Sequence, residues 1–349
     1  MTRVPDVPFV RVEGDARTRG RAHGTARATA LRAFLDDDLC RLNRILWRPV
    51  SPATLGPTID AYRTAIAAAV PELADEIDGL AEGAGLSRRE AVLLQARREI
   101  LGYRRVPAHG DCTAYARVGH GTPVLAQTVD LNGDLADQIA VLEVARDGSP
   151  GRALVLSFGG QLGYLGLNDA GLAIGINLIV GGTWKPGVPP YLAVRYLLDH
   201  ARDVKEGVEL LQTLPLASSR NLVLCDRSRA AWVELVDGRI RTVSAPAIAH
   251  TNHILHPDLT AQDEVNRFAR RSSVRRLEAC VTGLAGLRAN ASAAEHFALL
   301  SAPPVYVAAN GDIRHEHTVA TVVLFPARGE LHLRPGGQVD GPTRVFTLR

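Results

Sequence analysis

The chain has 349 residues, a hydrophobic fraction of 46%, and 40 basic against 37 acidic side chains. The length accommodates one large domain or two ordinary ones, and the apolar fraction predicts a sizeable buried core. A net charge of +3 without a basic block argues against a nucleic-acid partner, and no apolar run approaches the roughly 18 residues of a membrane span.

The N-terminus and the cysteines both indicate a cytoplasmic protein. The opening stretch MTRVPDVPFVRVEG lacks the apolar region of a signal peptide. The four cysteines, Cys40, Cys112, Cys225 and Cys280, form no CxxC pair and no zinc-ribbon spacing. Unpaired thiols in a reducing compartment fit this pattern best.

Residues 16–100 are predicted to be helical. From Ala28 to Leu46, leucines recur every three or four residues, which is the spacing of one helix face. A second helix is predicted over 58–70. A third begins near Pro71, since proline is favoured in the first turn, and ends at a glycine.

A capping box marks the start of a fourth helix. The Ser87 hydroxyl can accept from a backbone N–H of the first turn, and Glu90 can reach back to the N–H of Ser87. The apolar run AVLLQARREIL follows directly.

Downstream of Cys112 the sequence changes to strand patterns separated by Gly, Pro, Asn and Asp turns. Strands are predicted over CTAYARV, PVLAQTVD, IAVLEVA, RALVLSF, NLVLCD, AWVELVDG, IAHTNH, TVATVVLFP and ELHLRPGG. A hairpin is predicted to turn at Asn168 and Asp169, and FGGQLGYLG is interpreted as a bulged or closely packed strand. Helices are predicted over 190–201, 204–213, 262–285 and 292–300. Such an order favours sheets packed face to face with helices outside.

Cys112 lies where the helical pattern gives way to sheet. On residue type alone, a free cysteine is usually a buried small hydrophobe. If its thiol cuts the Asp111–Cys112 peptide bond, Cys112 gains an α-amine with a pKa of about 8. One residue then carries both a nucleophile and a base, and no catalytic histidine is needed. Residues 1–111 would then be a helical pro-segment and residues 112–349 the catalytic part.

Seven segments carry a resemblance to a known enzyme family. In chain order they are VEGDARTRGRAHG, DCTAYA, LAQTVDLNGD, LGLNDAGLAIGIN, SSRNLVLCD, AHTNH and TVATVVLFPARGELHLRPGGQ. Together they resemble the acyl-coenzyme A:6-aminopenicillanate acyltransferase family (peptidase family C45) of the N-terminal nucleophile hydrolases, over almost the whole chain. The resemblance implies an α+β fold, a four-layer αββα sandwich of two stacked antiparallel sheets.

The resemblance also implies roles for four residues. Cys112 would be the self-cleaving residue of a zymogen and then the nucleophile, while Asp130 would orient the new N-terminus. Asn252 would donate to the oxyanion, and Arg314 falls where the family often has an active-site arginine. The family usually has glycine before the cysteine, where this chain has Asp111, so cleavage would be slower or assisted by that carboxyl.

Three of these residues also have a plainer interpretation. Asp130, followed by Leu-Asn-Gly, could merely end a strand in a turn. Asn252 could satisfy a buried backbone group, and Arg314 could be a surface arginine.

The functional hypothesis is hydrolysis of a small acyl or aminoacyl amide through a Cys112 thioester. The alternative is transfer of the acyl group from a thioester or amide to an amine; hydrolysis is preferred because the sequence shows no acceptor pocket. The expected partners are the small-molecule substrate and the cleaved N-terminal chain, without nucleic acid or membrane. No cofactor or metal is implied, and coenzyme A would enter only as a leaving group.

Two hypotheses of other classes remain open. An uncleaved, non-catalytic binding protein of the same fold is favoured by Asp111. A metal-dependent hydrolase is favoured by HTNHILH, in which His250, His253 and His256 are spaced by three. In a strand, however, residues three apart point to opposite faces.

Overall fold

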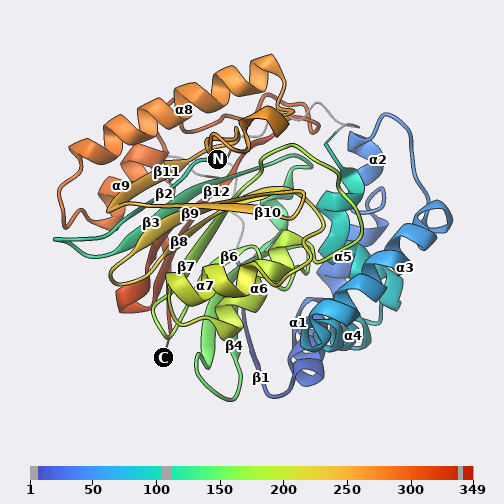
Figure 1. The fold of residues 1–349 in the computed structure, drawn as a ribbon. Helices are drawn as coiled ribbons and strands as arrows, with labels where there is room; N and C mark the ends of the chain where they lie inside the picture. The colour runs from blue at the N-terminus through green and yellow to red at the C-terminus, as the bar shows by residue number, and fades with distance from the viewer. Residues whose placement is uncertain (1–6, 104–111, 337–340, 349) are drawn as a thin grey trace.

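The computed structural model describes residues 7–103, 112–336 and 341–348, and two stacked sheets form its centre (Figure 1). Sheet A has eight strands in the order β1-β4-β5-β6-β7-β8-β9-β10. Their bounds are β1 Phe9–Glu13, β4 Ile139–Ala145, β5 Arg152–Phe158, β6 Leu165–Asn168, β7 Ala173–Asn177, β8 Arg220–Cys225, β9 Ala230–Val236 and β10 Arg239–Ser244. Within this sheet β1 pairs with β4 in parallel, and the other described pairs are antiparallel.

Sheet B has six strands in the order β11-β2-β3-β12-β13-β14, and its described pairs are antiparallel. Their bounds are β11 Ala247–His250, β2 Ala114–Arg117, β3 Val124–Leu131, β12 His317–Phe325, β13 Glu330–Pro335 and β14 Arg344–Thr347. Strands β2 and β3 pack against β7 and β8 of sheet A, so the main core lies between the sheets.

Helices cover both outer faces of this sandwich (Figure 1). Helices α8 (Arg267–Gly286) and α9 (Ala293–Leu300) pack on sheet B, and α6 (Pro190–His200) and α7 (Val204–Leu211) pack on sheet A. The predicted α+β, four-layer αββα arrangement is therefore confirmed. None of the described helices is long and apolar enough to cross a bilayer.

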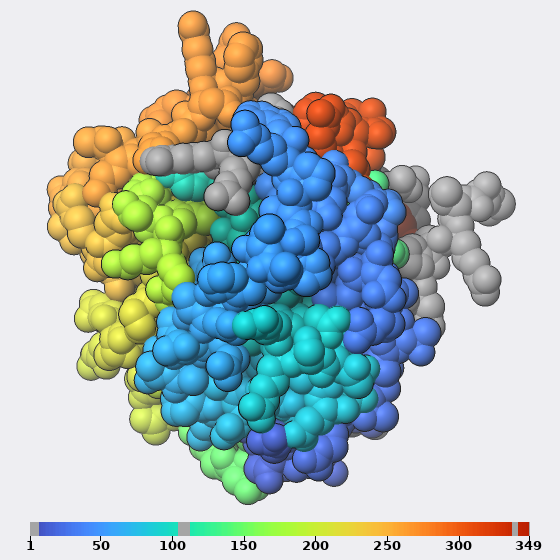
Figure 2. Space-filling view, turned by 90° about the vertical axis from the view of Figure 1, so that its right-hand side faces the viewer, coloured from blue at the N-terminus to red at the C-terminus, as the bar shows by residue number. Residues whose placement is uncertain are grey.

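Five further helices precede Cys112 and gather on one side of the sheets. They are α1 Ala16–Asp36, α2 Leu42–Ile45, α3 Pro52–Ala69, α4 Pro71–Ala84 and α5 Arg88–Leu101. Figure 2 shows this blue and cyan segment covering most of one face of the molecule. The predicted capping box begins α5, because Glu90 N donates to Ser87 Oγ (3.2 Å) and Ser87 N donates to Glu90 Oε2 (2.7 Å).

Helices α1 and α4 lie in unusually close contact. A Cβ at Gly20 would come within 1.9 Å of the Glu76 carbonyl oxygen, and a Cβ at Gly79 within 2.1 Å of the Arg17 carbonyl oxygen. Glycine is therefore required at both positions by the approach of the two backbones. The Gly-rich opening that carried part of the family resemblance thus serves helix packing.

Three strands were not predicted from the sequence, and one predicted strand was wrong. No sheet was expected before Cys112, yet β1 pairs with β4, about 130 residues later in the chain. Strands β10 and β14 were also missed. The segment FGGQLGYLG is a turn rather than a strand up to Leu165, since Gly159 and Gly160 both have positive φ, 53° and 82°.

The segment before Cys112 is joined to the rest by a buried ion-pair network. Glu76 of α4 accepts from both terminal nitrogens of Arg195 of α6 (3.0 and 2.9 Å) and from Arg19 Nε of α1 (3.2 Å). Arg195 also donates to Asp199 (3.0 Å). All four side chains are buried. The division of the chain at Cys112 into a pro-segment and a catalytic part stays a prediction. Residues before and after Cys112 belong to one hydrophobic core.

Candidate active site

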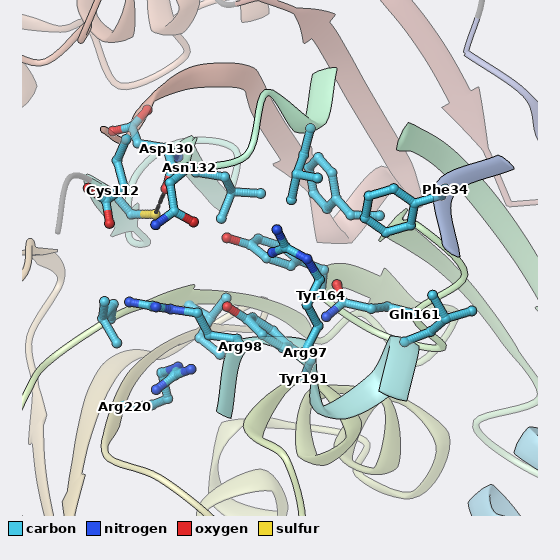
Figure 3. A pocket seen from close by; sticks show the side chains of 17 residues that line it. Phe34, Arg97, Arg98, Cys112, Asp130, Asn132, Gln161, Tyr164, Tyr191 and Arg220 are labelled. Carbon is cyan, nitrogen blue, oxygen red and sulfur yellow. Dashed lines mark hydrogen bonds between the residues drawn. The ribbon is translucent and has the colours of Figure 1, made fainter. Parts of the chain in front are cut away.

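Cys112 lies at the start of sheet B, two residues before β2. The antiparallel register places Ala114 opposite Gln127, which brings Cys112 beside the end of β3. There Asp130 N lies 3.4 Å from the Cys112 sulfur, with geometry for an N–H···S hydrogen bond. The side chain is 4% exposed and lines a pocket (Figure 3). The preceding residues His109, Gly110 and Asp111, and with them the predicted cleavage point, lie outside the described residues.

Two buried side chains hold the main chain at Cys112. Its carbonyl oxygen accepts from Asn177 Nδ2 (3.1 Å) and from Arg276 Nη1 (3.0 Å). Asn177 accepts in turn from Asn221 Nδ2 (3.0 Å), and Arg276 Nη1 also donates to Thr113 Oγ1 (3.0 Å). Because a buried guanidinium with several acceptors is rigidly held, the backbone at Cys112 is fixed.

Asp130 lies directly beside Cys112, at the end of β3. Its side chain is buried and accepts from Thr128 Oγ1 (3.1 Å), which itself accepts from Thr113 N (3.0 Å). A chain of hydrogen bonds thus connects the Asp130 side chain with Thr113, the residue after Cys112. Asp130 and Cys112 are brought together in the pocket, and the orienting role of Asp130 stays a prediction.

Asn252 is not among the residues that line the pocket, and it is linked to Cys112 through Arg276. It is 2% exposed, its Oδ1 accepts from Arg276 Nη2 (2.9 Å), and its Nδ2 donates to the Leu178 carbonyl (2.8 Å). Arg276 therefore bridges Asn252 and the Cys112 carbonyl. One amide hydrogen of Asn252 is committed to Leu178, which leaves the second for another acceptor.

Arg314 lies away from these residues. It is an exposed side chain that pairs with Asp312 (2.6 Å) and does not line the pocket. The plainer interpretation, a surface arginine, fits this position. Glu316, two residues later, does line the pocket.

Aromatic rings form much of the pocket wall. Tyr164 and Tyr191 stack with centroids 4.8 Å apart and an interplanar angle of 15°, and Phe158 meets Tyr164 edge-on at 4.9 Å. Burial raises the pKa of Tyr164, and the nearby Cys112 sulfur raises it further. Tyr164 therefore keeps its phenolic proton, and its hydroxyl group points toward the part of the pocket that holds Cys112 (Figure 3). A pocket with a stacked aromatic pair is thus present beside Cys112, although the sequence alone showed no acceptor pocket.

Three functional candidates were missed from the sequence. Asn177 ends the apolar strand GLAIGIN, so a buried amide there was a detectable signal. Arg276 belongs to an arginine-rich helix, and nothing in the sequence separates it from its neighbours. Asn132 lines the pocket, is 4% exposed, and its Nδ2 has no hydrogen-bond partner among the described residues.

The histidines of HTNHILH do not converge on one point. His250 Nε2 contacts Glu234 Oε1 (2.8 Å), while His253 Nδ1 contacts Ser273 Oγ (2.7 Å). Glu234 also accepts from the backbone N–H groups of Leu255 and His256, so the segment folds around this carboxylate. Within residues 7–103, 112–336 and 341–348, no three His, Cys, Asp or Glu side chains form a group that could hold a metal.

The sequence was compared with protein families and curated proteins. The profile of the acyl-coenzyme A:6-aminopenicillanic acid acyl-transferase family matches residues 117–338, which is more than half of the chain. A curated relative, the acyl-coenzyme A:6-aminopenicillanic-acid-acyltransferase 40 kDa form of Emericella nidulans, is 26% identical over 201 residues. The match covers 56% of each protein, so the chain spans about half the length of this curated relative.

Solved structures show which fold this is. A mutant of the conjugated bile acid hydrolase from Clostridium perfringens is similar with a TM-score of 0.50 and 12% identity, over 68% of this chain and 97% of that one. The penicillin V acylase of Agrobacterium tumefaciens has a TM-score of 0.47 and 16% identity, over 68% and 86%. At such low identity the first likeness establishes the fold alone, and it agrees with the sandwich of two stacked sheets described above.

Proposed function

The chain belongs to the acyl-coenzyme A:6-aminopenicillanic acid acyl-transferase family, and from this premise we propose that it is a self-processing cysteine amidohydrolase. The observation that carries the proposal is the position of Cys112, which has its sulfur in the pocket and its carbonyl held by Asn177 and Arg276. Self-cleavage after Asp111 gives Cys112 an α-amine beside its own thiol. Free cysteines are consistent with a cytoplasmic location.

The proposed reaction has two halves. The Cys112 thiol gives its proton to the α-amine while the sulfur bonds to the substrate carbonyl carbon. The tetrahedral intermediate collapses, the C–N bond breaks, and the departing amine takes the proton from the ammonium group. Water then attacks the thioester carbonyl carbon, the C–S bond breaks, and the same α-amine moves a proton from the water to the departing sulfur. The products are an amine and a carboxylic acid.

Asp130 and the asparagines support this chemistry. Asp130 would accept from the α-amine and fix its direction. The oxyanion needs polar hydrogens aimed at the developing charge, and two amides are candidates for this role. One is the second N–H of Asn252, which does not itself line the pocket but is linked to Cys112 through Arg276. The other is Nδ2 of Asn132, which lines the pocket and has no partner among the described residues.

Asn252→Ala is expected to lower kcat by about 10²–10³-fold, the usual loss for one oxyanion donor. The rate is measured on the cleaved fraction, quantified by intact mass, so that slow maturation is not mistaken for slow turnover. Asn132→Ala is the comparison. A normal rate in Asn252→Ala with a large loss in Asn132→Ala would assign the oxyanion to Asn132 instead.

Acyl transfer is the second candidate function. The curated relative is named as an acyltransferase, and the stacked ring pair of Tyr164 and Tyr191 offers a rigid platform for an acceptor. Correct positioning can give effective molarities of about 10⁵ M, enough to compete with water at about 55 M. The two reactions share the Cys112 thioester and differ only in what attacks it.

A partition experiment tests both candidates. Acyl 4-nitroanilides and acyl thioesters are supplied with increasing concentrations of an acceptor amine, and free acid is measured against new amide. We expect free acid to dominate at millimolar amine. Dominance of the new amide would make the enzyme a transferase. Without turnover of any probe, and without an acyl adduct on Cys112 by mass, the proposed function fails.

A further inference from the structure

Two arginines of α5 reach the pocket, and neither pairs with a carboxylate of the described residues. Arg97 and Arg98 are 7% and 8% exposed, and both line the pocket that holds Cys112. Arg97 Nε donates to the Cys40 carbonyl (2.7 Å), and Arg98 Nη1 donates to the Gly102 carbonyl (2.9 Å). In each, Nη2 has no hydrogen-bond partner among the described residues.

Three other buried arginines of this chain, Arg19, Arg195 and Arg220, are paired with acidic side chains. Arg195 has Glu76 and Asp199, and Arg220, on the same pocket wall as Arg98, donates to Glu99 (3.0 Å). A buried cation without a counter-charge is strongly unfavourable, because it loses hydration and gains no Coulomb energy. Arg97 and Arg98 differ from these three arginines, because each leaves Nη2 without a partner among the described residues and available to a ligand.

The pocket does not supply the missing counter-charge itself. Its lining carboxylates are Asp130 and Glu316, and neither forms an ion pair or hydrogen bond with Arg97 or Arg98 in the described part of the chain. Burial lowers the pKa of Arg97 to about 10, which leaves it cationic at neutral pH.

Both guanidinium groups are held in position. Arg97 lies over the Phe34 ring at 5.8 Å, and Arg98 lies over the Trp184 ring at 5.9 Å. A Cβ at Gly133 would come within 2.8 Å of Arg97 Nη2, so this glycine makes room for the group. In Figure 3 the Arg98 side chain extends along the wall below Cys112, and Arg97 points into the middle of the pocket beside Tyr164.

We propose that Arg97 and Arg98 form an anion subsite that binds a carboxylate of the substrate while Cys112 attacks its amide or thioester carbonyl. The inference rests on the proposed function for the identity of the reacting bond. A guanidinium presents a planar fork of donors that matches a carboxylate. Both arginines precede Cys112 in the chain, so the cleaved N-terminal chain would determine substrate choice as well as staying bound.

The carboxylate can belong to the acyl part or to the amine part of the substrate, and matched probes distinguish the two. Glutaryl 4-nitroanilide is compared with its neutral carboxamide analogue of equal length. Hexanoyl 4-aminobenzoate is compared with hexanoyl 4-aminobenzamide. We expect the anionic member of one pair to have a kcat/KM at least about tenfold higher, the size of one charge-assisted hydrogen bond.

The variants Arg97→Gln and Arg98→Gln are expected to reduce this charge preference to near unity. Arg97→Lys and Arg98→Lys keep the charge but lose the planar fork, so they should retain part of it. Arg88→Gln is the matched control, because Arg88 lies in the same helix with a side chain that is 59% exposed. It should keep the full preference.

Alkylation of Cys112 tests the subsite without turnover. The ratio of iodoacetate to iodoacetamide rates, relative to free cysteine, should be raised in the wild type and in Arg88→Gln and lowered in Arg97→Gln and Arg98→Gln. The other thiols do not interfere, since burial raises the pKa of Cys40 and Cys280 to about 12 and that of Cys225 further.

The outcomes separate the subsite from the reaction. Turnover with equal kcat/KM inside both probe pairs, or with a charge preference that survives both glutamine variants, overturns the subsite and leaves the proposed function standing. Charge-dependent alkylation without turnover of any probe leaves the subsite standing and overturns the proposed function. Absence of both effects overturns both.

Discussion

Cys112→Ala is expected to leave the protein as a single chain and to reduce kcat by about 10⁴-fold or more, the scale of losing a covalent nucleophile. The same sulfur would cut the bond from Asp111 and form the thioester, so both activities disappear together. Intact mass spectrometry and a denaturing gel measure the first effect. Turnover of the best acyl probe measures the second.

Cys280→Ala is the control for this experiment. Cys280 is another buried cysteine, and burial raises the pKa of its thiol to about 12, so it is not nucleophilic at neutral pH. Its removal should leave both cleavage and turnover in place. A wild-type chain that stays intact and is nonetheless active would refute self-processing, and an intact, inactive wild type would favour the non-catalytic binding protein.

Glu76→Ala is expected to lower the free energy of unfolding by about 3–5 kcal/mol, the usual cost of breaking a buried ion pair. The Glu76 side chain is 1% exposed and accepts from Arg195, which is fully buried, and from Arg19. Its removal leaves Arg195 with Asp199 alone and Arg19 without a carboxylate. Urea denaturation measures the loss, with the slope checked for constancy.

The Cys112→Ala background keeps the chain in one piece, so the unfolding midpoint does not depend on association of two chains. Glu82→Ala is the matched control, because Glu82 also accepts from two arginines, Arg17 and Arg21, but its side chain is 39% exposed. A surface pair of this kind contributes little. Equal shifts in Glu76→Ala and Glu82→Ala would contradict the importance that we assign to burial.

Glu76 and helix α5 connect the segment before Cys112 with the rest of the protein in different ways. Glu76 anchors α4 to α6, while α5 contributes Arg97 and Arg98 to the pocket wall. In a processed protein, a substitution that weakens the ion pairs of Glu76 should therefore change the substrate preference before it lowers the reactivity of Cys112.

Local signals predicted most of the elements. The capping box of Ser87 and Glu90 identified the start of α5, and the Pro71 signal identified that of α4, because caps act within one turn. The Asn168 turn and the alternation around it identified the hairpin of β6 and β7. Strand β1 was not predicted, because five residues next to a helix give a weak periodic signal and its partner β4 is distant in the chain.

The residues of the candidate site were likewise predictable only in part. Cys112 could be singled out because it lies at the change from helix to sheet pattern, and Asp130 because the family resemblance includes its strand. Arg314 was placed from sequence order alone, and sequence order does not determine which loop side chains reach the pocket. Arg314 pairs with Asp312 at the surface instead.

By itself, the sequence determined the succession of helices and strands, the family, and a nucleophile candidate at the helix-to-sheet boundary, since periodicity and caps depend on neighbours within a few residues. The tertiary structure alone decided that Asn177 and Arg276, 65 and 164 residues after Cys112, hold its carbonyl. It also decided that Arg97 and Arg98 line the pocket and pair with no carboxylate in the part of the chain that the structure describes. Burial and pairing of a charge depend on which distant segments pack around it, and no local pattern encodes that.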